Sequence, residues 1–128
     1  MKRMGLAVLV TALGGCASWS PETRIEEATY QALNVADYAQ TREVARRADC
    51  YHEVDSAWIV GAHPSERSTT ALFAAQAALH LGVTAILEDR GAPPWAVRLW
   101  QAATIGLEGR EVYRNWQIGL RFGSTAAP

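Results

Sequence analysis

Three titratable residues that could take part in acid–base chemistry, and one amide that could hydrogen-bond to them, lie in segments with the pattern of helices: Asp37, His80 and Glu108, with Gln40. A histidine titrates close to neutral pH, and a nearby carboxylate can hold or exchange its proton. Burying such a side chain without a polar partner costs about 1–3 kcal/mol. A buried network that links all four is one arrangement that meets this need. It would form a catalytic or ligand-binding cluster or serve packing specificity alone, and we favour packing.

Four potential metal ligands lie in one segment of weak periodicity: His52, Glu53, Asp55 and His63. Zinc sites use imidazole and carboxylate ligands. The spacing here, however, matches neither HExxH nor another paired-ligand pattern, and such residues in a loop are usually solvated. We therefore expect no metal and no other cofactor.

The motifs of several common enzyme classes are missing. No serine has the G-x-S-x-G setting of a nucleophile, and neither phosphate-binding pattern, GxxxxGK[ST] or GxGxxG, occurs. A non-enzymatic role is therefore the leading interpretation. A small periplasmic enzyme or ligand-binding protein that uses a cluster around His80 is the alternative.

The N-terminus has the layout of a secretory signal peptide. Lys2 and Arg3 give it a positive start, residues 6–13 form a short uncharged run, and small residues follow before Cys16. The run is too short to span a bilayer. The sequence LGGC that ends at Cys16 resembles the lipobox of bacterial lipoproteins.

The lipobox resemblance implies how this end of the chain is processed. In bacterial lipoproteins a dedicated peptidase cuts before the cysteine after a diacylglycerol has been attached to its sulfur. We therefore expect a signal peptide over residues 1–15, a tether over residues 16–21 and a helical domain over residues 22–128, with acyl chains such as palmitate on Cys16. Ala17 stands where aspartate would favour inner-membrane retention, so the resemblance implies the periplasmic face of the outer membrane.

The rest of the chain predicts an all-α fold, a small bundle of about three main helices with an irregular C-terminal tail. Helices are expected over residues 22–47, 66–90 and 94–114. The first has acidic residues at its start and basic residues at its end, which complements the helix dipole. Ser65 is a suitable N-cap, and Gly91 provides a stop. Residues 115–123 are expected to lie extended on the bundle.

Apolar periodicity predicts which helical faces are buried. In the first helix one narrow stripe of mostly small apolar residues, which also includes Gln40, is expected to pack closely on a neighbour: Ile25, Ala28, Ala32, Ala36 and Ala39. The short apolar patch at residues 57–60 is expected to anchor its loop to the core. The helix over residues 66–90 is apolar on both sides, so we expect it to be the central helix of the bundle.

Residues 68–87 contain no Asp, Glu, Lys or Arg, which is also typical of a transmembrane helix. Alanine and polar residues dilute the hydrophobicity of this segment, so we favour a core helix. An integral membrane protein that spans the bilayer with residues 68–87 remains a second alternative.

Composition argues against two broad classes of protein. The chain has 128 residues, 49% of them hydrophobic and 20% charged, which fits one globular domain. Its net charge is −1, so no basic excess is present to hold a nucleic-acid backbone, and we expect no nucleic-acid partner. Two cysteines cannot make a disulfide-rich scaffold, and Cys50 is the only thiol left once Cys16 is acylated.

Three segments resemble small uncharacterised helical proteins of bacterial and phage genomes: ALNVADYAQT at residues 32–41, VGAHPS at residues 60–65 and TIGLE at residues 104–108. The resemblance implies an α-helical fold, is compatible with membrane association and with a phage or prophage origin, and carries no established activity. We expect a lipid-anchored envelope protein that contacts the membrane through its N-terminal lipid. Its action would be by contact with an envelope protein partner.

Overall fold

The computed structural model describes residues 18–120, which form three long helices and one short helix. The long helices are α2 (Pro21–Arg46), α4 (Glu66–Asp89) and α5 (Pro94–Gln117), and α3 (Ala57–Val60) lies in the connection between α2 and α4. No strand occurs within residues 18–120. The predicted all-α bundle of three main helices is therefore confirmed. The predicted signal peptide and Cys16 lie outside the described residues.

The ends of α4 have the predicted signals, Ser65 and Gly91, and α2 is capped by Ser20, which was predicted to lie in the tether. The Ser20 hydroxyl accepts a hydrogen bond from the Thr23 backbone N–H at 3.1 Å, and the Ser65 hydroxyl does the same for Ser68 at 3.0 Å. These bonds satisfy N–H groups that have no partner within the first helical turn. Gly91, at φ 66°, follows α4 in the left-handed conformation that glycine adopts most easily.

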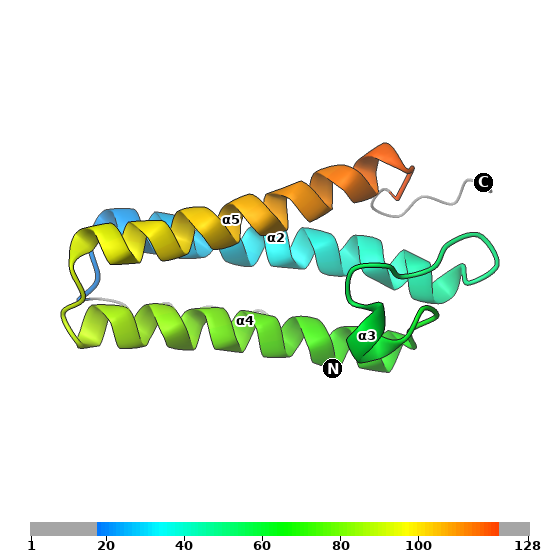
Figure 1. The fold of residues 1–128 in the computed structure, drawn as a ribbon, viewed down its shortest axis with the longest axis horizontal. Coiled ribbons are helices and arrows are strands. Elements are labelled where there is room, and N and C mark those ends of the chain that lie inside the picture. The colour runs from blue at the N-terminus through cyan, green and yellow to red at the C-terminus, as the bar shows by residue number, and fades with distance from the viewer. Residues whose placement is uncertain (1–17, 121–128) are drawn as a thin grey trace, which may run out of the picture.

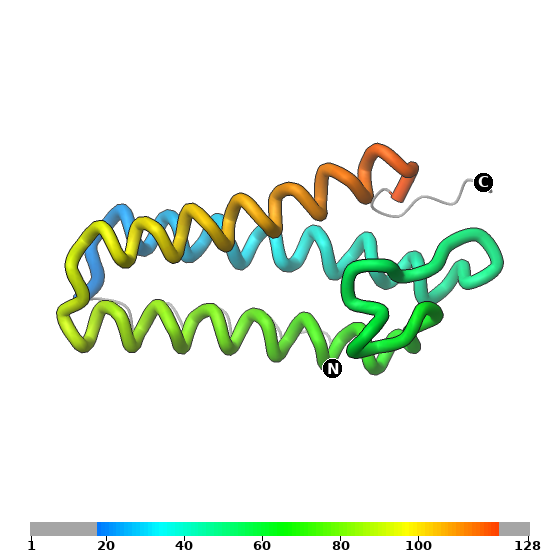
Figure 2. Tube along the Cα trace, viewed as in Figure 1, coloured from blue at the N-terminus to red at the C-terminus, as the bar shows by residue number. Residues whose placement is uncertain are grey.

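The three long helices lie side by side with their axes roughly aligned (Figure 1). Helix α2 runs parallel to α5, because Glu26 contacts Arg98 and Asn34 contacts Glu108. It runs antiparallel to α4, because Thr23 contacts Glu88 while Arg42 contacts Glu66. The start of α2 and the α4–α5 turn lie at one end, and the α2–α4 connection lies at the other (Figure 2).

Helix α2 is the central helix of the bundle. It packs closely against both α4 and α5, whereas α4 and α5 contact each other much less. The prediction that the helix over residues 66–90 is central was therefore wrong. That helix is apolar on both sides, yet only its Thr69, Phe73, His80 and Thr84 are buried. The side chains of α2 supply polar partners to both neighbours, and these partners hold the three helices together.

The buried side of α2 is mostly polar and follows alternating spacings of four and three residues: Thr23, Glu27, Tyr30, Asn34, Asp37, Thr41 and Val44. Such spacing marks the seam of packed helices. The predicted apolar stripe lies elsewhere, and Ile25 at its start is 67% exposed, so this prediction was wrong. The polar side chains take the inner positions because they hydrogen-bond across the helix interfaces.

Two further expectations about loops were wrong. The apolar patch at residues 57–60 forms α3 but does not enter the core, since Trp58 is 83% exposed. Helix α5 continues to Gln117, so the start of the predicted extended tail is helical. The backbone then turns at Gly119, and the side chain of Leu120 is buried.

Candidate functional site

The imidazole of His80 on α4 is a buried polar group that lies between the three long helices. Its Nδ1 lies 2.9 Å from Oε2 of Glu27 on α2, and its Nε2 shares a 2.8 Å hydrogen bond with Oγ1 of Thr104 on α5. The side chains of His80 and Glu27 are 2% and 1% exposed. A single ring therefore joins all three long helices.

Two aromatic rings enclose the same imidazole. Tyr30 stacks on His80 with ring centroids 3.5 Å apart and an interplanar angle of 8°. Trp100 lies 5.0 Å from the His80 ring centroid at 23°. Because α2 and α5 each contribute one ring, the imidazole is fixed in orientation and shielded on both faces.

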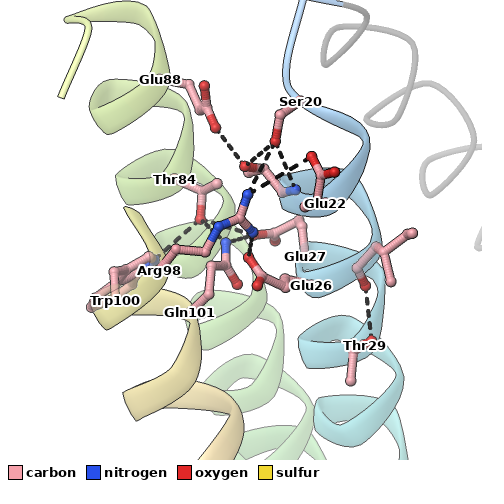
Figure 3. Close-up of polar contacts among 12 residues, drawn as sticks. Ser20, Glu22, Glu26, Glu27, Thr29, Thr84, Glu88, Arg98, Trp100 and Gln101 are labelled. Atoms are coloured by element: carbon pink, nitrogen blue, oxygen red, sulfur yellow. Dashed lines mark hydrogen bonds and ion pairs between the residues drawn. The ribbon is translucent and has the colours of Figure 1, made fainter. Parts of the chain in front are cut away.

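The carboxylate of Glu27 is the acceptor on which several side chains converge. It accepts hydrogen bonds from Gln31 Nε2 at 2.7 Å, Thr84 Oγ1 at 2.8 Å and Gln101 Nε2 at 3.3 Å. Figure 3 shows Thr84, Gln101 and Glu27 meeting from α4, α5 and α2. We call Glu27, Tyr30, His80, Thr84 and Gln101 the His80 cluster. Removing this buried carboxylate would lower the free energy of unfolding, because it would leave several hydrogen-bond donors unpaired.

The other three predicted residues of this site are buried but belong to separate contacts. Asp37 accepts a 2.7 Å hydrogen bond from Asn115 Nδ2. Glu108 accepts one from Asn34 Nδ2 at 3.4 Å. Gln40 Nε2 donates to the backbone carbonyls of residues 112 and 120. No hydrogen bond joins any two of Asp37, Gln40, His80 and Glu108, so the four do not form one hydrogen-bonded network, although Asp37 and Glu108 lie together in the lining of one hollow.

A hollow of about 260 Å³ lies at the end of the bundle that carries α3. Five of its lining residues are carboxylic acids: Asp37, Glu53, Asp55, Glu108 and Glu111. Trp58 and Ile59 of α3 also line it, and none of its lining residues is Arg, Lys or His. The Oε1 atom of Gln76, also in the lining, is buried without a hydrogen-bond partner. The hollow therefore offers acceptors and negative charge but few donors.

Electrostatics at the mouth of this hollow favour an incoming cation. Burial and the neighbouring Asp55 raise the pKa of Glu111 above its ordinary value. Arg114 partly offsets this, since its Nη1 lies 3.1 Å from Asp55 and 3.3 Å from Glu111. One arginine thus neutralises part of a group of five acids.

Two of the candidate metal ligands in the α2–α4 connection, Glu53 and Asp55, form other contacts. The carboxylate of Glu53 accepts the backbone N–H of Ser56 at 3.1 Å, and Asp55 pairs with Arg114. His52 lines a second, smaller pocket, and His63 is exposed. Within residues 18–120, no group of three or more His, Cys, Asp or Glu side chains is arranged to hold a metal ion.

Sequence reasoning missed the main partner of His80. Glu27 carries the interaction, yet in the sequence it is one of several acids near the start of a helix. The available signal was the spacing of polar residues in α2, which repeats every three or four positions. The same spacing links Gln101, Thr104 and Glu108 in α5, all of which face α2 or α4.

Comparisons with protein-family models, with curated proteins and with solved structures find no match. The function is therefore inferred from the residues of this chain.

Proposed function

We propose that this chain is a lipid-anchored protein of the bacterial envelope that acts by contact with another envelope protein and not by catalysis. Two features support the proposal. One is the signal sequence with Cys16 at its end. The other, which carries the contact, is the acidic hollow beside an almost fully exposed tryptophan.

The enclosure of His80 supports a packing role for its cluster. A general acid or base must come within hydrogen-bonding distance of the proton that it transfers. In His80 both ring nitrogens already face protein oxygens, and aromatic rings cover both faces. The cluster is therefore suited to fixing the three helices against one another, as buried polar networks do.

The hollow has the chemistry to receive a basic side chain from a partner. Its carboxylates would pair with an arginine or lysine, and arginine can bind a carboxylate through two parallel hydrogen bonds. Trp58 projects beside it, and exposed tryptophans are common among residues that dominate protein interfaces. The partner surface that fits here combines a cation with a small apolar area.

Photo-crosslinking in intact cells tests the contact. A photoreactive amino acid replaces Trp58 in the full chain, and the matched control places it at Arg90, an exposed residue at the opposite end of the bundle. We expect one discrete protein adduct from position 58 and none from position 90. No adduct from position 58, or the same adducts from both positions, would contradict the proposal.

A charge-neutral substitution then tests the predicted chemistry of the partner. Glu53→Gln keeps an oxygen that can accept the Ser56 N–H but removes the negative charge from the hollow. We expect a weaker adduct from position 58 in this background. Asp49→Asn is the control, because Asp49 is exposed and does not line the hollow. An adduct of equal strength in Glu53→Gln would show that the charge is not used.

A further inference from the structure

Each of the three long helices has a middle range in which the outward-facing residues are uncharged. In α4 no Asp, Glu, Lys or Arg occurs over residues 68–87. Over residues 27–41 of α2 and 99–109 of α5, the only charged residues are Glu27, Asp37 and Glu108, and all three are buried. We call the outward-facing residues of these three ranges the belt. Its exposed members include Ala28, Ala32, Val35, Leu79, Ile86, Leu99 and Leu107.

Charged side chains outside the interior gather at the two ends of the belt. At the end with the α4–α5 turn, Arg98 pairs with Glu26. At the end with α3, Arg42 and Arg46 pair with Glu66, and Arg114 pairs with Asp55. The distribution is thus a neutral middle between two charged rims.

Arg67 and Arg110 are exposed charges directly next to the belt, and both lie toward the α3 end; Arg110 shows how such a charge can reach past an apolar boundary. Its side chain is 63% exposed and lies 3.6 Å from the carboxylate of Glu111. It stands one residue beyond the belt on α5, on the side of the α3 end. The long side chain of an arginine lets its guanidinium group reach polar surroundings while its methylene groups remain against an apolar surface.

This arrangement is the reverse of a water-soluble bundle, in which apolar residues face inward and charges face out. Here Glu27, Asp37, His80 and Glu108 face inward, while Leu79 is 67% exposed. In a bilayer, ionisable side chains face the interior of a helix bundle and pair with one another. Polar side chains also hold neighbouring helices together there.

On α4 the belt matches the thickness of a bilayer, whereas its ranges on α2 and α5 are shorter, about 22 Å and about 16 Å. At about 1.5 Å per residue, the 20 uncharged residues of α4 extend over about 30 Å, and this is the approximate thickness of the hydrocarbon core. Among the described helices, α4 alone is long and apolar enough to cross a membrane by composition. Helices α2 and α5 are not apolar enough by composition to meet this criterion. The acids within their belt ranges lower their hydropathy, but these acids point inward.

Aromatic side chains stand near both rims. Trp95 is exposed at the start of α5, and Tyr113 and Trp116 are exposed near its end. Tryptophan and tyrosine are enriched where membranes meet water, because one part of each ring system is apolar and another is polar. Their positions fit the two boundaries that the charges define.

We propose that the belt lies in a lipid bilayer, with acyl chains covering α2, α4 and α5, and that the His80 cluster joins the three helices within it. This proposal goes beyond the lipid anchor and does not depend on it.

The distribution of arginines indicates how the bundle is oriented across the membrane, because the cytoplasmic flanks of membrane-spanning helices carry an excess of basic residues. The α3 end has Arg42, Arg46, Arg47, Arg67, Arg110 and Arg114, whereas the other end has Arg24, Arg90 and Arg98.

The orientation has a consequence for location. It places the α3 end in the cytoplasm and the start of α2 outside, on the side where a lipid on Cys16 would be attached. Such a bundle belongs in the cytoplasmic membrane, in place of the outer membrane that Ala17 indicates by analogy.

Cysteine accessibility tests whether water reaches the belt. In the full chain with Cys16→Ser and Cys50→Ser, single cysteines replace Val35, Leu79 or Leu107 in the belt, and Val54 or Ile118 outside it, all of which are exposed. Isolated membranes are treated with a water-soluble maleimide. We expect labelling at positions 54 and 118 and at least several-fold less at the belt positions, with equal labelling of all after denaturation. Equal labelling before denaturation would overturn the proposal.

Labelling with a lipid-soluble reagent distinguishes a belt covered by lipid from a belt covered by another protein. An iodinated aryl diazirine that partitions into bilayers is photolysed in membranes containing the unaltered chain. We expect it to modify peptides from residues 27–41, 68–87 and 99–109. If these peptides are protected from both reagents, a second copy or another protein covers the belt, and the proposal is wrong. Palmitate labelling of Cys16 is independent of both results, so failure here is distinct from failure of the lipid anchor.

Matched lysine substitutions add a third measurement. Leu79→Lys introduces a charge in the middle of the belt, and Val54→Lys introduces one at a similarly exposed residue outside it. We expect the amount of membrane-inserted protein to fall several-fold for Leu79→Lys alone, because a charge at the bilayer centre is costly. Equal levels of the two variants would contradict a lipid-facing Leu79.

Discussion

The imidazole of His80 and the phenol ring of Tyr30 stack face to face, with centroids 3.5 Å apart and an interplanar angle of 8°. The two residues come from antiparallel helices, and the stack holds the imidazole where it contacts the carboxylate of Glu27. A local aromatic contact thus fixes the geometry of the central polar contact between α2 and α4.

Replacing Glu27 should cost the most stability of any single substitution in the His80 cluster. Glu27→Ala removes the acceptor for Gln31, Thr84 and Gln101 and leaves His80 without its carboxylate. We expect a loss of about 3–5 kcal/mol in the free energy of unfolding, as for other buried pairs that lose one partner. Denaturant titration of the purified protein in detergent micelles measures it.

The control for this variant is Glu22→Ala. Glu22 is exposed in the first turn of the same helix. Its removal should leave the unfolding midpoint close to that of the unaltered protein. Similar midpoints for Glu27→Ala and the unaltered protein would contradict the role given to Glu27.

Removing the stacked ring should have a smaller effect. Tyr30→Leu keeps an apolar side chain but loses the ring contact with His80, and such aromatic pairs contribute about 0.5–1.5 kcal/mol. Tyr113→Leu is a suitable control, because Tyr113 is exposed on α5. Thermal unfolding should rank the unaltered protein and Tyr113→Leu together, above Tyr30→Leu. The reverse order would argue against the stack.

The ion pairs at the α3 end should depend on pH. Hydrogen bonds from Arg42 and then Arg46 lower the pKa of Glu66 below its ordinary value of 4.5. A carboxylate whose pKa is lowered on folding stabilises the fold above its unfolded pKa, and this contribution is lost as the pH falls through the lower, folded value. Glu66→Gln should therefore melt slightly earlier than the unaltered protein at pH 7.

The difference should shrink on acidification below pH 4.5 and at high salt, because these side chains are about half exposed and screened by solvent. Paired melting curves across this pH range check the prediction. A difference that stays constant with pH would show that the amide disturbs packing and not charge.

Cys16 should be the site of lipid attachment. Cells grown with radiolabelled palmitate should label the unaltered chain and leave Cys16→Ser unlabelled. Cys50→Ser is the matched control, because it removes the other cysteine of the chain and should leave labelling intact. Unlabelled wild-type protein would remove the lipid anchor from the proposed function.

Local signals in the sequence predicted the helices well. Ser65 occupies the N-cap of α4, Pro94 opens α5, and Gly91 follows α4 in a left-handed conformation. These effects act within one helical turn, so they can be recognised without knowing what the helix packs against. The number and order of the main helices follow from them.

The buried faces could not be predicted in the same way. Apolar periodicity placed Ile25 and the alanines of α2 in the core, but the structure places Glu27, Asn34 and Asp37 there. A polar residue can be buried only if a partner meets it. Apart from Gln31 one turn away, the partners of Glu27 lie more than fifty residues away along the chain, on α4 and α5. Single-helix patterns contain no information about such partners.

The approximate ranges of the three long helices and the uncharged stretch at residues 68–87 could be predicted from the sequence. The fold was needed to show that Glu27 is the partner of His80, that Asp37 and Glu108 line one hollow without a hydrogen bond between them, and that the apolar faces point outward. This difference arises because capping and propensity are local interactions. Burial of a charged or polar group depends instead on partners that the fold brings together from three helices.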